Sequence, residues 1–282
     1  MEKINILLTG KSGFLGKELE VYLGKKYNIL DLNRFDLTDS NLVEQVLKEN
    51  RVDVVLHTAT KGGKRTEKDT VQDLIDNLTM FNNLIKLRDQ YKALFCFCSG
   101  AAYDRALGVD NISEEEILNR NPSDYYGLSK NIIARESLQY DNIFTFRLFG
   151  CFGNGETSAR FFSSLRRNML ESKPMIIHQD REMDFFSTED VSQVILYYLE
   201  NYNTQKLPKD INLVYSNKLS LSALANKFRE VVGAPTLLIR TEQRGGSPYT
   251  GNGEKLKSLN IKLRGLSAGI RSCYGGALNA SS

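Results

Sequence analysis

Three glycines, each three residues after the one before, constrain the fold of this chain more than any other feature of its sequence. Gly10, Gly13 and Gly16 follow the apolar run 4–8 and open a segment with helical periodicity. In such a strand–turn–helix unit, one glycine permits a tight turn, a second lets a pyrophosphate approach the backbone, and a third lets the helix pack closely on the strand. The pyrophosphate then lies at the helix N-terminus, where free N–H groups favour an anion. The turn therefore predicts a dinucleotide site.

Strands and helices alternate along the first 150 residues. Short apolar runs predict buried strands, and 3.6-residue periodicity predicts helices. The predicted strands cover residues 4–8, 27–32, 52–57, 94–98, 143–148, 175–178, 184–187 and 211–215. The predicted helices cover residues 14–24, 40–50 with Asp39 or Ser40 as the cap, 67–91, 124–140, 157–170, 188–201 and 220–232. We therefore expect an α/β fold: a Rossmann-type doubly wound parallel sheet with a smaller C-terminal substrate-binding α/β domain.

The alternation loosens after Gly150, which suggests where the two domains divide. Residues 1–150 with about 188–215 are expected to bind the dinucleotide, and about 151–187 with 216–282 the substrate. Residues 241–253 are polar and rich in glycine, which predicts a loop. The last residues, 275–282, predict a frayed tail.

Composition and charge argue against several classes of partner. The formal net charge is +3, which gives no reason to expect nucleic acid or an anionic membrane as a partner. No apolar run reaches the length of about 18 residues that a transmembrane helix needs, and the N-terminus lacks the pattern of a signal peptide, so we expect a cytoplasmic protein. The four cysteines form no cluster of ligands, so no metal site is expected.

The residues after the second predicted strand bear on which dinucleotide binds. Asp31 lies about 20 residues beyond the turn, where a carboxylate can hold the ribose hydroxyls of NAD. Arg34 can instead pair with the 2′-phosphate of NADP. Asp36 and Leu37 are expected beside the adenine ring. Asp31 and Arg34 point in opposite directions; we expect NADP as the cofactor, with NAD as the alternative.

A tyrosine and a lysine lie four residues apart in a predicted helix. At that spacing Tyr126 and Lys130 share one face of the helix, whereas Tyr125 faces elsewhere. A phenol exchanges its proton poorly at neutral pH, but a neighbouring ammonium and the positive ring of an oxidised nicotinamide favour its ionised form. Ser99 follows the fourth predicted strand, at the sheet edge where a cofactor binds, and its hydroxyl can bind a carbonyl or alkoxide oxygen. Together, the three residues predict a hydride-transfer centre.

The order of these motifs resembles the extended short-chain dehydrogenase/reductases of the NAD-dependent epimerase/dehydratase family, which modify nucleotide sugars. Matching segments are the glycine turn, 53–59, Asn77 with 83–85, 99–103, 147–153, 184–191 and 265–270. The resemblance implies that Ser99, Tyr126 and Lys130 are catalytic and that Lys130 also binds the nicotinamide ribose. It implies further cofactor contacts at Ser12, Phe14, Leu15, Thr58, Ala59, Thr60 and Asn77. It also implies a homodimer formed by two helices of each subunit, one of which carries the tyrosine.

Two subgroups of that family are most similar to the chain. Residues 60–63 resemble a loop of GDP-fucose synthase, and residues 35–39 resemble dTDP-4-dehydrorhamnose reductase; both reduce 4-keto sugar nucleotides. The 4,6-dehydratases carry an Asp-Glu pair where this chain has Ala101 and Ala102, which argues against dehydration. GDP-fucose synthase has a cysteine in the place of Ala101, which argues against 3,5-epimerisation. The resemblance thus implies reduction of a 4-keto sugar with Tyr126 as proton donor.

Four basic residues are expected to bind the nucleotide-linked sugar together with Ser99 and Tyr126: Lys61, Arg160, His178 and Arg181. Arg160 is expected at the diphosphate, and Arg181 is expected to substitute for a family arginine that Met183 replaces. Two other functions remain open. An NAD-dependent 4-epimerase would use the same three catalytic residues, and a non-catalytic regulator would use only the dinucleotide site.

Overall fold

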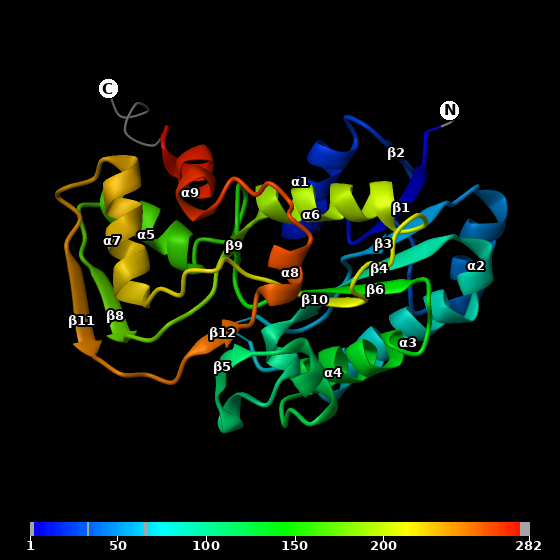
Figure 1. Ribbon diagram of the computed structural model, residues 1–282, viewed down its shortest axis with the longest axis horizontal. Helices are drawn as coiled ribbons and strands as arrows, with labels where there is room; N and C mark the ends of the chain where they lie inside the picture. The colour runs from blue at the N-terminus through cyan, green and yellow to red at the C-terminus, as the bar shows by residue number, and fades with distance from the viewer. Residues whose placement is uncertain (1–2, 33, 65–66, 277–282) are drawn as a thin grey trace.

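A six-stranded parallel sheet forms the centre of the structure (Figure 1), a computed structural model that describes residues 3–32, 34–64 and 67–276. The strand order is β10-β6-β4-β3-β1-β2. The bounds are β1 (Asn5–Thr9), β2 (Asn28–Ile29), β3 (Val54–His57), β4 (Ala93–Ser99), β6 (Ile143–Leu148) and β10 (Asp210–Leu213). The expected doubly wound α/β fold is confirmed. The frayed tail predicted to extend to residue 282 lies, from residue 277 on, outside the described residues.

Helices cover both faces of this sheet. On one face α1 (Phe14–Leu23) packs beside α6 (Thr188–Asn201), and on the other lie α2 (Ser40–Glu49), α3 (Val71–Lys86) and α4 (Tyr125–Ser137). The apolar run of β1 supplies both cores, because successive side chains of a strand point to opposite faces. Ile6 and Leu8 belong to the core beneath α1 and α6, and Leu7 belongs to the core beneath α2 and α3.

Local caps explain where several helices begin. Asp39 caps α2 as predicted, accepting hydrogen bonds from the N–H groups of residues 41 and 42 at 2.9 and 3.3 Å. The helix predicted from residue 67 begins only at Val71, because Thr70 and Asp73 form a reciprocal capping box. The Thr70 N–H donates to Asp73 Oδ2 at 2.7 Å, and Asp73 N donates to Thr70 Oγ1 at 3.2 Å.

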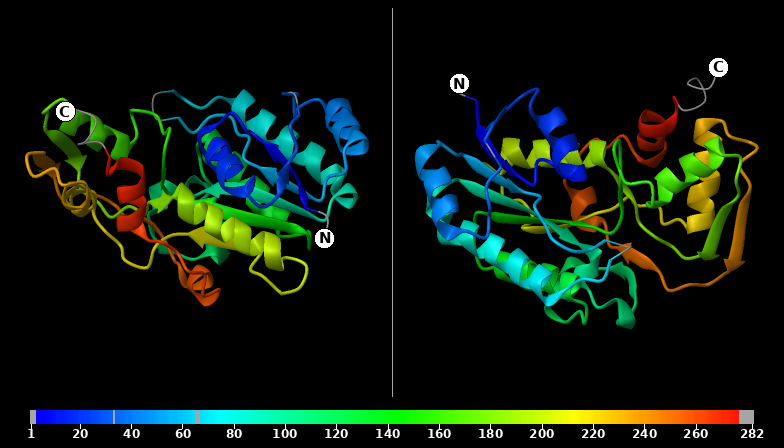
Figure 2. Two further views of the ribbon diagram at one scale, coloured as in Figure 1. Left: turned by 90° about the horizontal axis from the view of Figure 1, so that it is seen from above. Right: turned by 180° about the vertical axis from the view of Figure 1, so that it is seen from behind.

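The smaller part of the molecule lies at the end opposite α2, as the two views of Figure 2 also show. It contains α5 (Phe161–Leu170), α7 (Leu221–Val232), α9 (Leu266–Tyr274) and a two-stranded parallel sheet of β8 (Met175–Gln179) and β11 (Ile239–Gln243). The aromatic rings of Phe162, Phe228 and Tyr274 meet in its core. No helix of the described residues is long and apolar enough to cross a membrane.

One predicted loop was wrong, and one predicted strand is shorter than expected. Residues 241–253 are not a continuous loop, since they contain the end of β11 and all of β12 (Tyr249–Gly251), which pairs with β5 (Val109–Ile112). These are short strands formed by backbone pairing with distant partners, so they carry little hydrophobic pattern. The strand predicted over residues 27–32 pairs with β1 only at Asn28 and Ile29, because β2 is the sheet edge and the chain then turns toward a cleft.

Candidate active site

A cleft of about 2340 Å³ runs along the carboxyl ends of the parallel strands. The turn between β1 and α1, the ends of β3 and β4, the start of α4, and parts of α5 and β8 line it. In doubly wound sheets, such a crevice forms where neighbouring strands connect to helices on opposite faces, which here occurs between β1 and β3. The cleft therefore lies where the glycine turn predicted a dinucleotide.

The glycine turn is packed against its neighbours with no room for side chains. Gly10 has a φ of +71°, and a Cβ there would lie 2.5 Å from the backbone nitrogen of Ala59. A Cβ on Gly16 would lie 2.3 Å from the carbonyl oxygen of Gly10. Gly13 precedes α1 and provides no side-chain cap. This shape fits a pyrophosphate at the start of α1, because only glycines allow the close approach of helix, strand and ligand.

In the segment after β2, Asp31 and Arg34 differ in whether they line the cleft. Asp31 does not line the cleft; its side chain is 96% exposed and its carboxylate lies 3.2 Å from Lys11 Nζ. Lys11 and Arg34 do line the cleft, as does Asp36. The Asp36 carboxylate accepts two hydrogen bonds from Thr38, which lower its pKa. Lys11 was not predicted to line the cleft, although a cation inside the glycine turn was the available signal.

The segment after β3 forms the wall opposite the glycine turn. Thr58, Ala59, Thr60 and Lys61 line the cleft there. Asn77 lies behind this segment and is buried: its Oδ1 accepts from the backbone nitrogen of Lys61 at 2.8 Å and its Nδ2 donates to the Lys61 carbonyl at 3.1 Å. Asn77 thus fixes the loop that carries these side chains.

The three predicted catalytic residues meet in the middle of the cleft. Ser99 ends β4, while Tyr126 and Lys130 lie on α4, whose first turn is capped by Asp124. Lys130 Nζ lies 5.7 Å from the centre of the Tyr126 ring and donates to the Phe97 carbonyl at 3.2 Å.

Burial determines the protonation states of this group. Burial raises the pKa of Tyr126 to about 12, although hydrogen bonding with Ser99 lowers it in part. Burial also lowers the pKa of Lys130. At neutral pH Tyr126 is a phenol, so it can donate a proton. No group of three or more His, Cys, Asp or Glu side chains in the described ranges is arranged to hold a metal ion.

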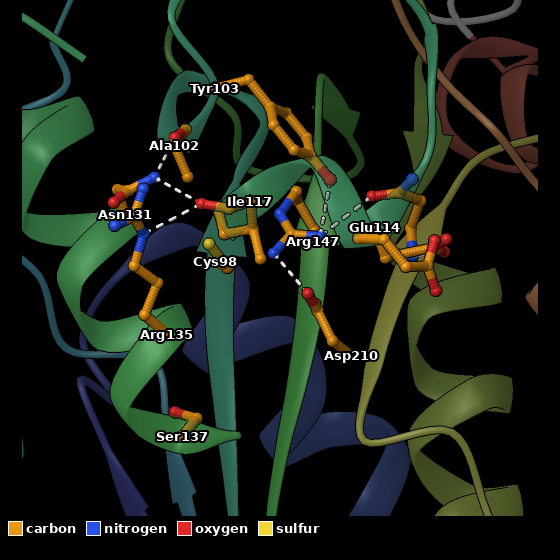
Figure 3. A network of polar contacts seen from close by, with 12 residues as sticks. Cys98, Ala102, Tyr103, Glu114, Ile117, Asn131, Arg135, Ser137, Arg147 and Asp210 are labelled. Carbon is orange, nitrogen blue, oxygen red and sulfur yellow. Dashed lines mark hydrogen bonds and ion pairs between the residues drawn. The ribbon is translucent and has the colours of Figure 1, made fainter. Parts of the chain in front are cut away.

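A buried polar network supports the turn that follows Ser99 (Figure 3). Arg147 on β6 donates to Tyr103 Oη at 3.0 Å and forms an ion pair with Asp210 on β10, whose Oδ2 lies 2.7 Å from Nη2. Asn131 on α4 donates to the carbonyl of Ala102 at 2.9 Å. The network thus joins the serine turn, the helix that carries Tyr126 and two strands of the sheet.

The end of the cleft that lies in the smaller part is lined by basic side chains. Of the residues expected to bind the substrate, His178 and Arg181 line this part of the cleft, and Arg160 lines the cleft beside the glycine turn. The Arg160 guanidinium lies 5.4 Å from the ring centre of Phe14. His178 is paired with Glu242 at 2.7 Å, and its side chain is 81% exposed. Further residues that line the cleft and were not predicted are Arg105, Arg167 and Tyr249.

Comparison with known proteins agrees with this geometry. The family model described as "NAD dependent epimerase/dehydratase family" matches residues 6–213. No curated protein matches the chain. A GDP-D-glycero-L-gluco-heptose synthase from Campylobacter jejuni, in the presence of NADPH, is similar in structure, with a TM-score of 0.81 and 21% identity over 100% of this chain and 99% of that one.

Two further solved structures have the same fold. The GDP-mannoheptose C4 reductase from Campylobacter jejuni with NADP bound has a TM-score of 0.80 and 22% identity, over 97% of this chain and 98% of that one. A dTDP-glucose 4,6-dehydratase from Bacillus anthracis in complex with NAD has a TM-score of 0.78 and 16% identity, over 99% and 97% of the two chains.

Proposed function

Because the chain belongs to the NAD-dependent epimerase/dehydratase family, we propose that it reduces the 4-keto group of a nucleotide-linked sugar with NADPH. The observation that carries this proposal is the meeting of Ser99, Tyr126 and Lys130 in a cleft that has a dinucleotide turn on one side and Arg167 and Arg181 of the smaller part on the other. Reduction is favoured over dehydration because the two residues after Gly100 are the buried alanines Ala101 and Ala102, which carry no acid or base.

In this mechanism Tyr126 is the proton donor. When bound, NADPH supplies a hydride to the carbonyl carbon. The phenol of Tyr126 gives its proton to the carbonyl oxygen, and the Ser99 hydroxyl donates a hydrogen bond to that oxygen as negative charge develops on it. Lys130 lies beneath the tyrosine ring, where its positive charge stabilises the phenolate left after transfer.

Lys11 and Arg34 support NADP as the cofactor. Both cations line the adenosine end of the cleft, and both can approach a 2′-phosphate. Asp31, the residue that would favour NAD, is exposed and paired with Lys11. Two of the structural neighbours are described with NADPH or NADP, whereas the dehydratase is described with NAD.

We assign the substrate diphosphate to the arginines of the smaller part. Arg181, with Arg167 on α5, lines the cleft in the smaller part, and Arg160 lines it beside Phe14 of the glycine turn. A guanidinium binds phosphate oxygens in a bidentate manner. Residues 1–150 with about 188–215 would then hold the cofactor, and about 151–187 with 216–282 the sugar nucleotide. Because two of the similar structures act on GDP-linked heptoses, GDP sugars are the first substrates to test.

We also propose a homodimer formed through α3 and α4. These adjacent helices expose Val71, Ile75, Tyr125 and Ile132, with 39–51% of each residue accessible. Val71 and Ile75 lie four residues apart, on one face of α3. A second copy of the chain is the occupant that the family resemblance implies.

The proposal is tested by incubating the purified protein with a GDP-linked 4-keto sugar and following NADPH oxidation at about 340 nm. We expect turnover that Tyr126→Phe abolishes and that Tyr125→Phe leaves intact. Release and identification of any bound dinucleotide completes the experiment. Tightly retained NAD without net consumption of NADPH would instead identify a 4-epimerase, and a binding protein without catalysis would show no effect of Tyr126→Phe on any activity.

A further inference from the structure

A second tyrosine hydroxyl lies beside Ser99, from a distant part of the chain. Tyr249 begins β12, lines the cleft and is only 9% exposed. A Cβ on Gly100 would lie 2.7 Å from Tyr249 Oη, so this hydroxyl lies directly over the residue that follows Ser99. Hydrogen bonding with Ser99 lowers the pKa of both Tyr249 and Tyr126, against the rise that burial causes. Two tyrosine hydroxyls therefore converge on one serine.

The structure fixes the position of Tyr249 through both its backbone and its ring. The Tyr249 carbonyl accepts from the backbone nitrogen of Asp184 at 3.2 Å, and its ring lies edge-on to Phe149 with 5.2 Å between the ring centres. Lys218 Nζ joins the neighbouring segments, with Asp184 Oδ2 and the Gly251 carbonyl oxygen each at 2.7 Å. The hydroxyl is thus held at its place before any ligand binds.

The hydrogen-bonding capacity of Ser99 suggests what Tyr249 does. A serine hydroxyl has two lone pairs and one proton to donate. The backbone nitrogen of Ala101 donates to Ser99 Oγ at 3.1 Å and occupies one lone pair. We propose that Tyr249 is a positioning residue whose hydroxyl donates to the second lone pair of Ser99. The Ser99 hydroxyl can then donate its hydrogen bond to only two acceptors, the Tyr126 oxygen and the carbonyl oxygen of the substrate.

Two physical consequences follow. Burial raises the pKa of Tyr249 well above its usual range, so the group keeps its proton and remains a donor. A proton donated by Ser99 stabilises the phenolate of Tyr126, whereas a Ser99 that accepts from Tyr126 stabilises the phenol. Without the Tyr249 hydroxyl, Ser99 can accept a hydrogen bond from Tyr126, so the pKa of Tyr126 rises. The other titratable groups that face Tyr126, which are Lys130, Cys98, Arg160 and Asp69, stay in place.

The kinetic test compares Tyr249→Phe with wild type and rests on the proposed reduction. The variant removes only the hydroxyl and keeps the ring against Phe149. We expect kcat to fall about tenfold, less than the loss of a direct donor to a developing oxyanion, with KM changed less than about twofold. Tyr198→Phe is the matched control, since the Tyr198 hydroxyl is buried away from the cleft and donates to the Pro208 carbonyl at 2.9 Å. Its kcat should stay at the wild-type value even if its melting temperature falls.

A second measurement needs no sugar substrate. Tyrosine labelled with ¹³C at Cζ is titrated by NMR in the complex with NADP⁺, and the signal lost in Tyr126→Phe identifies Tyr126. We expect a higher pKa for Tyr126 in Tyr249→Phe than in wild type or Tyr198→Phe. An unchanged pKa would overturn the inference, as would a rise in KM at constant kcat, which would make Tyr249 a substrate contact. If wild type fails to turn over any 4-keto sugar, the proposed function fails, while the titration still decides the role of Tyr249.

Discussion

Replacing Arg147 by methionine tests how strongly the sheet depends on its buried ion pair. The Arg147 side chain is fully buried, and its partner Asp210 is 4% exposed. Methionine fills much of the same volume but leaves the Asp210 carboxylate without its cation. Breaking a buried pair from one side costs about 3–5 kcal/mol, because a charge then remains in a poorly solvated place. That is a large part of the roughly 5–15 kcal/mol by which such a protein is stable.

The cost should depend on pH in a defined direction. Burial already raises the pKa of Asp210 above its ordinary value of 3.8, and Arg147 opposes that rise. In Arg147→Met the opposition is lost, so the folded-state pKa rises further while the unfolded value stays near 3.8. Between these two values the folded protein binds more protons than the unfolded one, so stability increases as the pH falls. The variant should therefore recover part of its loss in mild acid.

Urea unfolding followed by far-ultraviolet circular dichroism, at pH 5.5 and pH 8, measures both effects. Lys173→Met is the matched control, because the Lys173–Glu171 pair has a similar distance of 2.8 Å but side chains that are 67% and 44% exposed; we expect a loss below about 1 kcal/mol. Arg147→Met combined with Asp210→Leu should regain most of the stability. A loss below about 1 kcal/mol in Arg147→Met, or no rescue by the second substitution, would refute the reasoning.

Three further predictions concern the cofactor and the assembly. Gly16→Ala should weaken NADPH binding about 10- to 100-fold by calorimetry, because its Cβ would lie 2.3 Å from the carbonyl oxygen of Gly10. Gly276→Ala is the control, since a Cβ there has open space and NADPH should bind normally. Equal affinities of the two variants would contradict the packing argument. Lys11→Ala should lower NADPH affinity about tenfold and leave NADH affinity unchanged, and a parallel loss for both would show that Lys11 does not bind the 2′-phosphate. Ile75→Asp should convert a dimer to a monomer in light scattering; an unchanged mass would place the interface elsewhere.

Short-range signals in the sequence predicted much of the fold and most of the cleft. The turn from Gly10 to Gly16 and the cap at Asp39 depend on neighbouring residues, so their structure follows from local chemistry. The direction in which a side chain points does not follow from its neighbours in the sequence. Arg34 lines the cleft whereas Asp31 is exposed and paired with Lys11, a difference that no periodicity reveals.

Elements formed by distant partners were the ones missed. β12 is a strand because it pairs with β5, and its three residues carry too weak a pattern to predict. Tyr249 was consequently not predicted at the site, since nothing in an expected loop indicates that its tyrosine lies beside Ser99. Tyr126 and Lys130, the proposed catalytic pair, by contrast share one helix, so their closeness was predictable from their spacing.

The position of β10 has a consequence for synthesis on the ribosome. β6, which carries Arg147, needs β10 and Asp210 as its neighbour, yet residues 149–209 lie between them in the chain. At about 5–20 residues per second, roughly 3–12 s pass before the carboxylate emerges. During that interval the arginine must stay solvated and the edge of β6 stays unpaired. A nascent chain halted before residue 210 should therefore be a substrate for chaperones, because the six-stranded sheet is complete only after α5, β8, α6 and β10 have been made.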